Sequence, residues 1–170
     1  IHKLSKENVK EIVLTGINIG DFGIENGKRK KKFIDLLKEI ENLDGVQRYR
    51  ISSIETNLVS NEIIEFVSKS NKFLPHFHIP LQSGCDKILK SMSRRYDVDL
   101  YTKTIEKIKS LIPDASIGTD VIVGYPSESE SDFFETYNYL NNLKISYLHV
   151  FPYSERENTR AVKLNDIIDY

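Results

Sequence analysis

Polar side chains and glycines gather where the predicted strands of this chain end. They include hydroxyls, amides, a carboxylate and turn glycines, in the segments Thr15-Gly16-Ile17-Asn18, Ser53-Ile54-Glu55, Gln82-Ser83-Gly84, Gly124-Tyr125-Pro126 and Tyr153-Ser154. Any one of these segments is typical of an ordinary turn, because Gly, Ser, Asn and Pro all suit turns. Parallel strands bring their carboxyl ends to one edge of the sheet, where ligands bind. Together the segments therefore predict a shared pocket.

His76, His78 and His149 are the side chains that could ligate a metal ion. His76 and His78 share one face of a predicted strand, because strand side chains alternate with a period of two. No H-E-x-x-H helix or other carboxylate–histidine spacing accompanies them. We therefore expect interior histidines with polar neighbours rather than a metal site.

Cys85 is the only cysteine, so the chain cannot form an internal disulfide or complete a cysteine-built metal cluster. It lies near a predicted helix N-terminus, which favours a thiolate, but no base partner is evident. We expect a small buried residue. The basic segments Lys28–Lys32 and Arg94-Arg95 could contact phosphates, although charge runs are usually solvated faces.

The stretch Asp114–Glu128 contains the strand around which the other elements are predicted to assemble. Its core, Ile117–Val123, is a nearly continuous apolar run, which is typical of a strand covered on both faces. Gly124 then begins a turn. Ser127 and Glu130 have the spacing of a capping box for the helix that follows.

Strands and helices alternate along the rest of the chain. Strands are predicted at residues 12–15, 49–54, 76–81, 117–123 and 147–151, and helices at 4–10, 33–43, 61–69, 86–92, 100–112 and after 130, with a further helix at the C-terminal end. This alternation predicts βαβ units and a parallel sheet. A closed eight-stranded barrel typically needs about 250 residues. The chain has 170, which favours one domain with an open, partial barrel.

The composition is that of an ordinary soluble domain, with 29% charged and 39% hydrophobic residues. A net charge of −1 gives no global basic field for nucleic acid. No apolar run approaches membrane-spanning length, and no secretory signal is visible. Because the chain begins with Ile1 rather than Met, we expect it to be part of a longer protein.

Longer segments of the chain form a specific set. They are EIVLTGINIGDFG at Glu11–Gly23, RYRISSIE at Arg48–Glu55, HIPLQSGCDKILKSMSRRY at His78–Tyr96, DVIVGYPSESESDF at Asp120–Phe133 and HVFPYSERENTRA at His149–Ala161. Over nearly the whole chain, this set resembles the radical S-adenosylmethionine (SAM) methylthiotransferases. LTGINIGDFG and YLHVFPYSER are most similar to the branch that methylthiolates N6-threonylcarbamoyladenosine beside the tRNA anticodon.

The chain also departs from the family pattern at two places. Ser127-Glu128-Ser129 stands where Gly-Glu-Thr is usual, and Thr56 stands where proline commonly follows the SSIE segment. The C-x-x-x-C-x-x-C motif that holds the family's SAM-binding 4Fe–4S cluster is also absent. The resemblance implies that residues 1–170 are part of a radical SAM core domain. The cluster motif, an N-terminal cluster domain and a C-terminal RNA-binding barrel would then lie outside the chain.

The resemblance implies SAM and 4Fe–4S clusters as cofactors, and tRNA, an electron donor and a sulfur source as partners. It further implies a cytoplasmic monomer with no membrane association. The piece itself is expected to be inactive and to bind SAM weakly, because in the family SAM chelates the open iron of the cluster.

The residues that match the family's SAM contacts lie at strand ends or on the central strand: Thr15, Gly16, Asn18, Glu55, Gln82, Gly118, Val123, Gly124 and Tyr153. The first three match the segment that receives the methionine amino group. The next two suit that amino group and the ribose hydroxyls. The glycines and valine match a strand on whose backbone adenine packs, and the tyrosine matches the last strand end, near adenine or substrate.

Other interpretations stay open. One is a methylthiotransferase that acts on a ribosomal-protein aspartate, and another is a non-catalytic barrel remnant that binds RNA or protein. A phosphate-binding eight-stranded barrel is weaker, because strands and a glycine-rich phosphate loop are missing. An upstream three-cysteine motif in the full-length gene would support catalysis.

Overall fold

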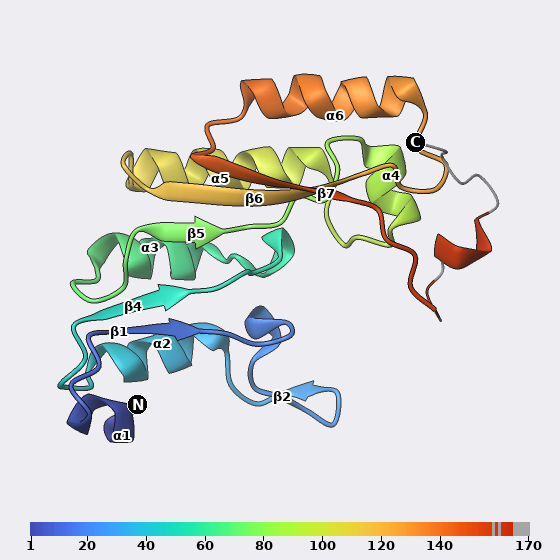
Figure 1. Cartoon of the computed structure of the whole chain (residues 1–170). Coiled ribbons are helices and arrows are strands. Elements are labelled where there is room, and N and C mark those ends of the chain that lie inside the picture. Colours follow the sequence, from blue (N-terminus) through green and yellow to red (C-terminus); the bar gives the residue numbers. More distant parts are fainter. Residues whose placement is uncertain (158, 160, 165–170) are drawn as a thin grey trace.

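Parallel strands lie side by side in chain order and form one open, curved sheet (Figure 1). The computed structural model describes residues 1–157, 159 and 161–164, so the helix predicted at the C-terminal end lies outside the described residues. The parallel strands are β1 (Glu11–Leu14), β4 (Arg48–Ile51), β5 (His76–His78), β6 (Ser116–Val123) and β7 (Tyr147–Pro152). The parallel pairing predicted for these five strands is confirmed.

Two regular ladders make up this sheet. One joins β1 to β4, and the other joins β5, β6 and β7. The ladders are linked by backbone bonds from Tyr49 N to Lys72 O at 2.8 Å and from Ile54 N to His78 O at 3.0 Å. Among the described residues, no strand pairs with the outer edge of β1 or of β7. The open partial barrel predicted from the sequence is therefore confirmed.

Helices connect the strands and cover one face of the sheet (Figure 1). The longer helices are α2 (Phe33–Glu41), α3 (Asn61–Lys69), α5 (Val98–Leu111) and α6 (Glu130–Asn142), and the shorter ones are α1 (His2–Lys6), α4 (Asp86–Ser91), and the 3-10 helices η1 (Ile19–Asp21), η2 (Thr56–Leu58) and η3 (Ala161–Lys163). A hairpin of β2 (Ile24–Glu25) and β3 (Lys28–Arg29) was not predicted. Its turn residues Asn26 and Gly27 both have positive φ, as a tight hairpin turn requires.

The core lies between the helices and one face of the sheet. Leu37, Ile64 and Ile108 of the helices are almost fully buried against sheet residues such as Phe77 and Ile117. The opposite face of the sheet contains polar side chains that are only partly buried. It is therefore an open inner surface, as expected for a barrel that does not close.

The prediction that the central strand is covered on both faces is wrong. Ile117, Thr119 and Val121 of β6 are buried toward the helices, whereas Asp120 and Ile122 lie on the open face and are only partly buried. The run looks almost continuously apolar because Ile122 on the open face is apolar as well. The polar side chain on the helix face, Thr119, is buried there because its hydroxyl has hydrogen-bond partners. The hydroxyl of Thr119 accepts from Leu81 N at 3.0 Å and lies 2.9 Å from the Tyr101 hydroxyl, which donates to Ile79 O at 2.8 Å.

The capping box of α6 lies two residues beyond the predicted one. Ser129 is the N-cap, its hydroxyl accepts from Asp132 N at 3.3 Å, and its own N–H donates to the Asp132 carboxylate at 2.8 Å. Ser127 instead continues the turn in a left-handed conformation with φ of 71°. The turn is held by Glu128, whose buried carboxylate accepts from Gly124 N at 2.6 Å. Ser127 thus occupies a conformation that glycine adopts without strain.

We predict that Ser127→Gly stabilises the protein. A non-glycine residue in this region costs about 1–2 kcal/mol, part of which is offset because glycine gains entropy in the unfolded chain. One kcal/mol raises the melting temperature by about 2–4 °C for a domain of this size. Thermal unfolding measures the shift. The control Ser129→Ala removes the N-cap of α6 and should lower the melting temperature. A melting temperature of Ser127→Gly below that of the wild type would contradict the prediction.

Candidate functional site

A cavity of about 750 Å³ lies at the carboxyl ends of β5, β6 and β7. Its wall includes side chains from the strands, from the loop after α4 and from the segment after β7: Gln82, Arg94, Asp120, Ile122, Phe151 and Tyr153. The apolar part of the wall comes from the ends of the central and last strands, and the polar part from the turns. Ligands of α/β barrels bind at this edge, so the shared pocket predicted from the strand ends is present here.

Two polar atoms in this wall are buried without a hydrogen-bond partner among the described residues. They are the hydroxyl oxygen of Tyr153 and Nε of Arg94. The Tyr153 ring packs edge-on against Tyr125, with centroids 5.5 Å apart, and its backbone N–H donates to Val123 O at 2.8 Å. Its position is therefore fixed. Leaving a buried donor without a hydrogen-bond partner costs about 1–3 kcal/mol. A ligand that accepts hydrogen bonds from both groups removes this cost and gains binding free energy from each.

Gln82 reaches the cavity through a strained backbone. Its φ is 70°, which is uncommon for a residue other than glycine. The conformation is held by bonds to the central strand, from Gln82 N to Asp120 O at 2.8 Å and from Ile122 N to Gln82 O at 2.9 Å. Such strain persists where the surroundings over-determine it, often at functional sites. The strain therefore supports a ligand-binding role for Gln82.

The structure places the predicted site residues along one edge of the sheet but not in one cavity. Gln82 and Tyr153 line the cavity, and Val123 and Gly124 form the end of β6 beside it. Thr15, Gly16, Asn18 and Glu55 follow β1 and β4 at the other half of the edge and do not line it. Their contacts with SAM remain predictions.

Charged side chains connect the two halves of this edge. Glu55 accepts from Arg95 at 3.0 Å and lies 3.5 Å from Arg94, which also lines the cavity. Arg95 also lies 3.6 Å from Asp21, whose carboxylate accepts from the Asn18 amide at 2.7 Å. The pair Arg94-Arg95 is thus not a free solvated face, because both arginines are bound to Glu55. The side chains of Lys28–Lys32 are exposed, as expected for a solvated face.

Gly118 has a structural reason to lack a side chain. A Cβ atom at this position would lie 1.9 Å from the ring of Tyr147, which crosses the strand there. The hydroxyl of Tyr147 lies 2.9 Å from Nε2 of His76 and 3.3 Å from Nδ1 of His78. Glycine at 118 therefore makes room for a polar cluster of the chain itself, and the adenine contact predicted there stays a prediction.

The histidines lie on the open face of the sheet, but the prediction of interior histidines with satisfied hydrogen bonds holds only in part. His149 is 52% exposed, and Nδ1 of His76 and Nε2 of His78 are buried without a hydrogen-bond partner among the described residues. Burial lowers the pKa of His76, and the positive charge of nearby Arg50 lowers it further. His78 and His149 both approach the carboxylate of Asp120. Asp120 could not be predicted as a partner of the histidines, because strand register, rather than sequence spacing, brings it to them.

Cys85 is 2% exposed, which confirms the prediction of a buried residue. Burial raises its pKa to about 11, and a hydrogen bond with the Glu135 carboxylate adds to this rise. Its thiol also lies 3.5 Å from the Asp132 carboxylate. A protonated, buried thiol is neither a nucleophile nor a cluster ligand. Since Cys85 is the only cysteine, the residues of this chain do not fit a 4Fe–4S cluster.

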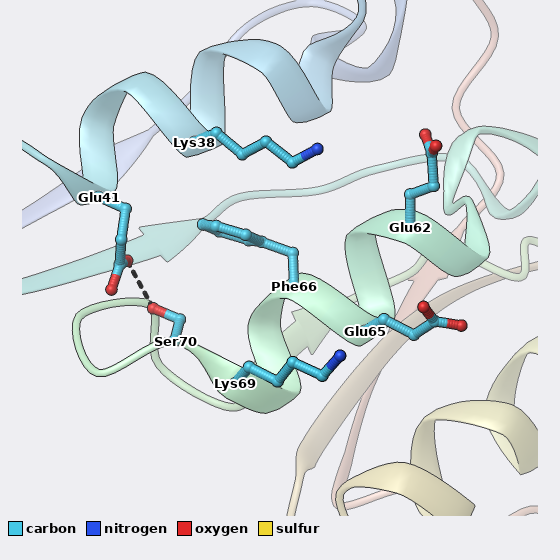
Figure 2. A pocket seen from close by; sticks show the side chains of 7 residues that line it. All are labelled: Lys38, Glu41, Glu62, Glu65, Phe66, Lys69 and Ser70. Carbon is cyan, nitrogen blue, oxygen red and sulfur yellow. Dashed lines mark hydrogen bonds between the residues drawn. The ribbon is translucent and has the colours of Figure 1, made fainter.

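Another hollow, of about 360 Å³, lies on the helical side of the sheet between α2 and α3 (Figure 2). Figure 2 shows Phe66 between the two helices and the hydrogen bond from Ser70 to Glu41, which is 2.6 Å long. The hollow is lined by charges of both signs, including Lys38 and Glu62, and it is far from the strand ends. We regard it as a solvated groove between helices.

An open parallel sheet with helices on one face and a cavity at its carboxyl edge defines an α/β barrel-type domain, a class in which ligands bind at that edge. A sequence model of the Radical SAM superfamily matches residues 1–140. The chain therefore belongs to the radical SAM superfamily, whose members use SAM and a 4Fe–4S cluster.

Curated relatives cover most of the chain. It is 44% identical, over 94% of its length, to threonylcarbamoyladenosine tRNA methylthiotransferase MtaB of Bacillus subtilis (strain 168), and spans 35% of that protein. It is 38% identical, over 99% of its length, to tRNA-2-methylthio-N(6)-dimethylallyladenosine synthase of Natranaerobius thermophilus, and spans 37% of that protein. The chain thus spans about a third of the relatives it matches.

Solved structures share the fold at low sequence identity. The methyltransferase TsrM of Kitasatospora setae has a TM-score of 0.67 at 12% identity, over 88% of this chain and 29% of that one. Elp3 of Methanocaldococcus infernus has a TM-score of 0.66 at 15% identity, over 99% of this chain and 44% of that one. These similarities support the radical SAM fold.

We predict that Gly124→Ala lowers stability, because Gly124 has a φ of 74°. A side chain in this conformation costs about 1–3 kcal/mol. If adenosine also packs here, Gly124→Val should reduce SAM cleavage by the full-length enzyme beyond its loss of stability, and more than Gly124→Ala does. Melting temperature and SAM cleavage are measured on both variants. Cleavage that falls only in step with stability would exclude the adenosine contact.

We also predict that Cys85 resists alkylation in the folded protein, because its raised pKa leaves little thiolate at neutral pH. A brief pulse of iodoacetamide followed by peptide mass spectrometry should label Cys85 only after denaturant is added. Substantial labelling of the native protein at pH 7 would contradict the burial.

Proposed function

We propose that this chain is the central part of the radical SAM domain of a tRNA methylthiotransferase. The reaction adds a methylthio group to C2 of N6-threonylcarbamoyladenosine next to the anticodon. The observation that carries this proposal is the 44% identity, over 94% of the chain, to a Bacillus subtilis protein named for that activity. Since the chain spans 35% of that relative, the cluster cysteines and an RNA-binding region would come from outside these 170 residues.

The cavity suits the nucleoside part of SAM. Its volume of about 750 Å³ lies within the range of about 300–1,000 Å³ usual for small-molecule sites. Ile122 and Phe151 offer an apolar wall for the adenine, and the Tyr153 hydroxyl and Arg94 Nε need hydrogen-bond partners. SAM supplies radical chemistry that removes a hydrogen atom from an unreactive carbon. The chain's own residues hold this cofactor and keep water from the reacting groups.

The other half of the strand-end edge suits the methionine part of SAM. Thr15, Gly16 and Asn18 follow β1, and we assign them to the methionine amino group on the basis of the family resemblance. Glu55 is proposed to contribute from the end of β4, where its arginine partners fix its carboxylate. Because Arg94 contacts both Glu55 and the cavity, it would couple the methionine end of the cofactor to the adenosine end.

A second candidate substrate is N6-dimethylallyladenosine in tRNA. The 38% identity over 99% of the chain to a synthase named for that product favours it over a ribosomal-protein substrate. The higher identity to the threonylcarbamoyladenosine enzyme places it second. Both relatives bear the names of tRNA-modifying enzymes, which also opposes a non-catalytic remnant.

We further propose that the whole protein acts as a monomer with an electron donor and a sulfur source. No helix of the described residues is long and apolar enough to cross a membrane. We propose the cytoplasm as its location because tRNA is the proposed substrate.

Nucleoside analysis tests the proposed reaction. Deleting the gene in its own organism should abolish 2-methylthio-N6-threonylcarbamoyladenosine in digested tRNA and leave N6-threonylcarbamoyladenosine in its place. Liquid chromatography with mass spectrometry measures both nucleosides. Loss of the 2-methylthio dimethylallyl product instead would identify the second candidate, and unchanged tRNA would refute a tRNA substrate.

We predict that Tyr153→Phe in the full-length enzyme weakens SAM binding. One neutral hydrogen bond contributes about 0.5–1.5 kcal/mol, which is a change of about 2- to 13-fold in Kd. Tyr125→Phe is the matched control, because that hydroxyl already donates to Ser91 O at 3.3 Å. Equilibrium binding should change for the first variant alone. Equal effects of the two variants would remove Tyr153 from the site.

A further inference from the structure

Three potential metal ligands converge on the open face of the sheet. Nε2 of His78 lies 2.9 Å from Oδ1 of Asp120, and Nδ1 of His149 lies 3.0 Å from the same oxygen. The three ligand atoms lie within 4.8 Å of one another. The sequence alone predicts no metal site at His78 and His149, because no carboxylate spacing joins them; Asp120 supplies the carboxylate.

Strand register fixes the arrangement. Asp120 on β6 is the direct register partner of His149 on β7. His78 on β5 pairs with Gly118, which precedes Asp120 by two residues and so shares its face of the sheet. All three side chains therefore extend from strands rather than from loops. Sites built on strands hold their geometry more exactly than sites built on loops.

Tyr147 orients His78 in the way that an outer partner orients a metal ligand. Its hydroxyl lies 2.9 Å from Nε2 of His76 and 3.3 Å from Nδ1 of His78. When the hydroxyl donates to His76, its oxygen accepts from Nδ1–H of His78. Nε2 of His78 then carries a lone pair and lies 2.9 Å from the Asp120 carboxylate. Metal-bound histidines are usually oriented by such a bond from the other ring nitrogen.

With His78 protonated at Nδ1, the arrangement brings two acceptors together. Nε2 of His78 is buried, and although it is 2.9 Å from the carboxylate, the pair is not aligned as a hydrogen bond. Two acceptor atoms at this distance repel each other electrostatically, and a cation beside them offsets the repulsion. A metal ion that accepts both lone pairs removes the repulsion and gives the buried nitrogen a partner.

We propose that His78, Asp120 and His149 bind a divalent transition-metal ion such as Zn²⁺ or Fe²⁺. Two imidazoles and one carboxylate are a donor set that such ions use. Ligands at about 2.0–2.2 Å from a metal, with angles of about 90–110°, lie about 3–3.5 Å apart. The two nitrogen–oxygen distances of 2.9 and 3.0 Å match this requirement.

The site is accessible from the cavity. The side chain of His149 is 52% exposed, and Asp120 forms part of the cavity wall. A bound ion would thus have an entry path and free coordination positions on the cavity side, for water or a small anion. The proposal rests on the residues of this chain alone and does not depend on the methylthiotransferase assignment.

Metal binding to the full-length protein tests the proposal. Protein purified without oxygen is titrated with Zn²⁺, and zinc and iron are counted by inductively coupled plasma mass spectrometry. The wild type should bind one Zn²⁺ per chain at this site. His149→Ala removes a ligand and should weaken the binding by at least about 100-fold, because loss of a ligand's hydrogen-bond partner alone lowers metal affinity by about 10- to 100-fold. His149 is the decisive position, because an exposed side chain can be removed without disturbing the core.

His2→Ala is the matched control, because His2 is an exposed histidine on α1 and offers no ligand atom to the group. It should retain the zinc. Co²⁺ as a second probe should give visible absorption bands that His149→Ala lacks. The visible absorption of any iron–sulfur cluster should stay unchanged in each variant, which separates this site from the cluster.

The proposal is overturned if the wild type binds no more zinc than His149→Ala. It is also overturned if His2→Ala loses the ion as fully as His149→Ala does. The three groups would then form only a hydrogen-bonded cluster. Neither result bears on the proposed tRNA reaction, which nucleoside analysis tests separately.

Discussion

The parallel pairing of β6 with β5 on one side and β7 on the other determines most of what this chain can do. The register places Thr119 and Val121 against the helices and Asp120 on the open face. A shift by one residue would exchange the two faces, since strand side chains alternate. It would bury Asp120 among apolar side chains and separate it from both histidines. The buried hydroxyl network around Thr119 and Tyr101 fixes the register on the helical side.

Much of the fold could be predicted because its signals are local. The helix at 61–69 has both a helical apolar period and a Ser60 cap, and the structure gives it those bounds. The capping box of α6 was misplaced because Ser127 and Ser129 offer competing spacings, and only the φ of 71° at Ser127 shows which one belongs to the turn. The Asn26-Gly27 hairpin was overlooked because its flanking residues are charged rather than alternately apolar. The turn chemistry alone would have identified it.

The functional edge was less predictable, because it depends on contacts between residues far apart in sequence. Strand ends correctly indicated the region of Gln82 and Tyr153. They could not show that Glu55 is bound by arginines about 40 positions further along the chain. They also could not show that Tyr147 occupies the space above Gly118. A glycine in a strand indicates close approach, but the sequence does not say whether the approaching group is a ligand or another side chain.

The outer edges of β1 and β7 lead to a different property of the domain. Val13 on β1 is 51% exposed and Val150 on β7 is 55% exposed, and neither outer edge has a strand partner among the described residues. Such edges present unpaired backbone groups beside apolar side chains, and they template the addition of another strand. A piece of this length in isolation would therefore tend to self-associate through its edges. In a larger protein, the same edges would be the natural places for neighbouring segments to extend the sheet.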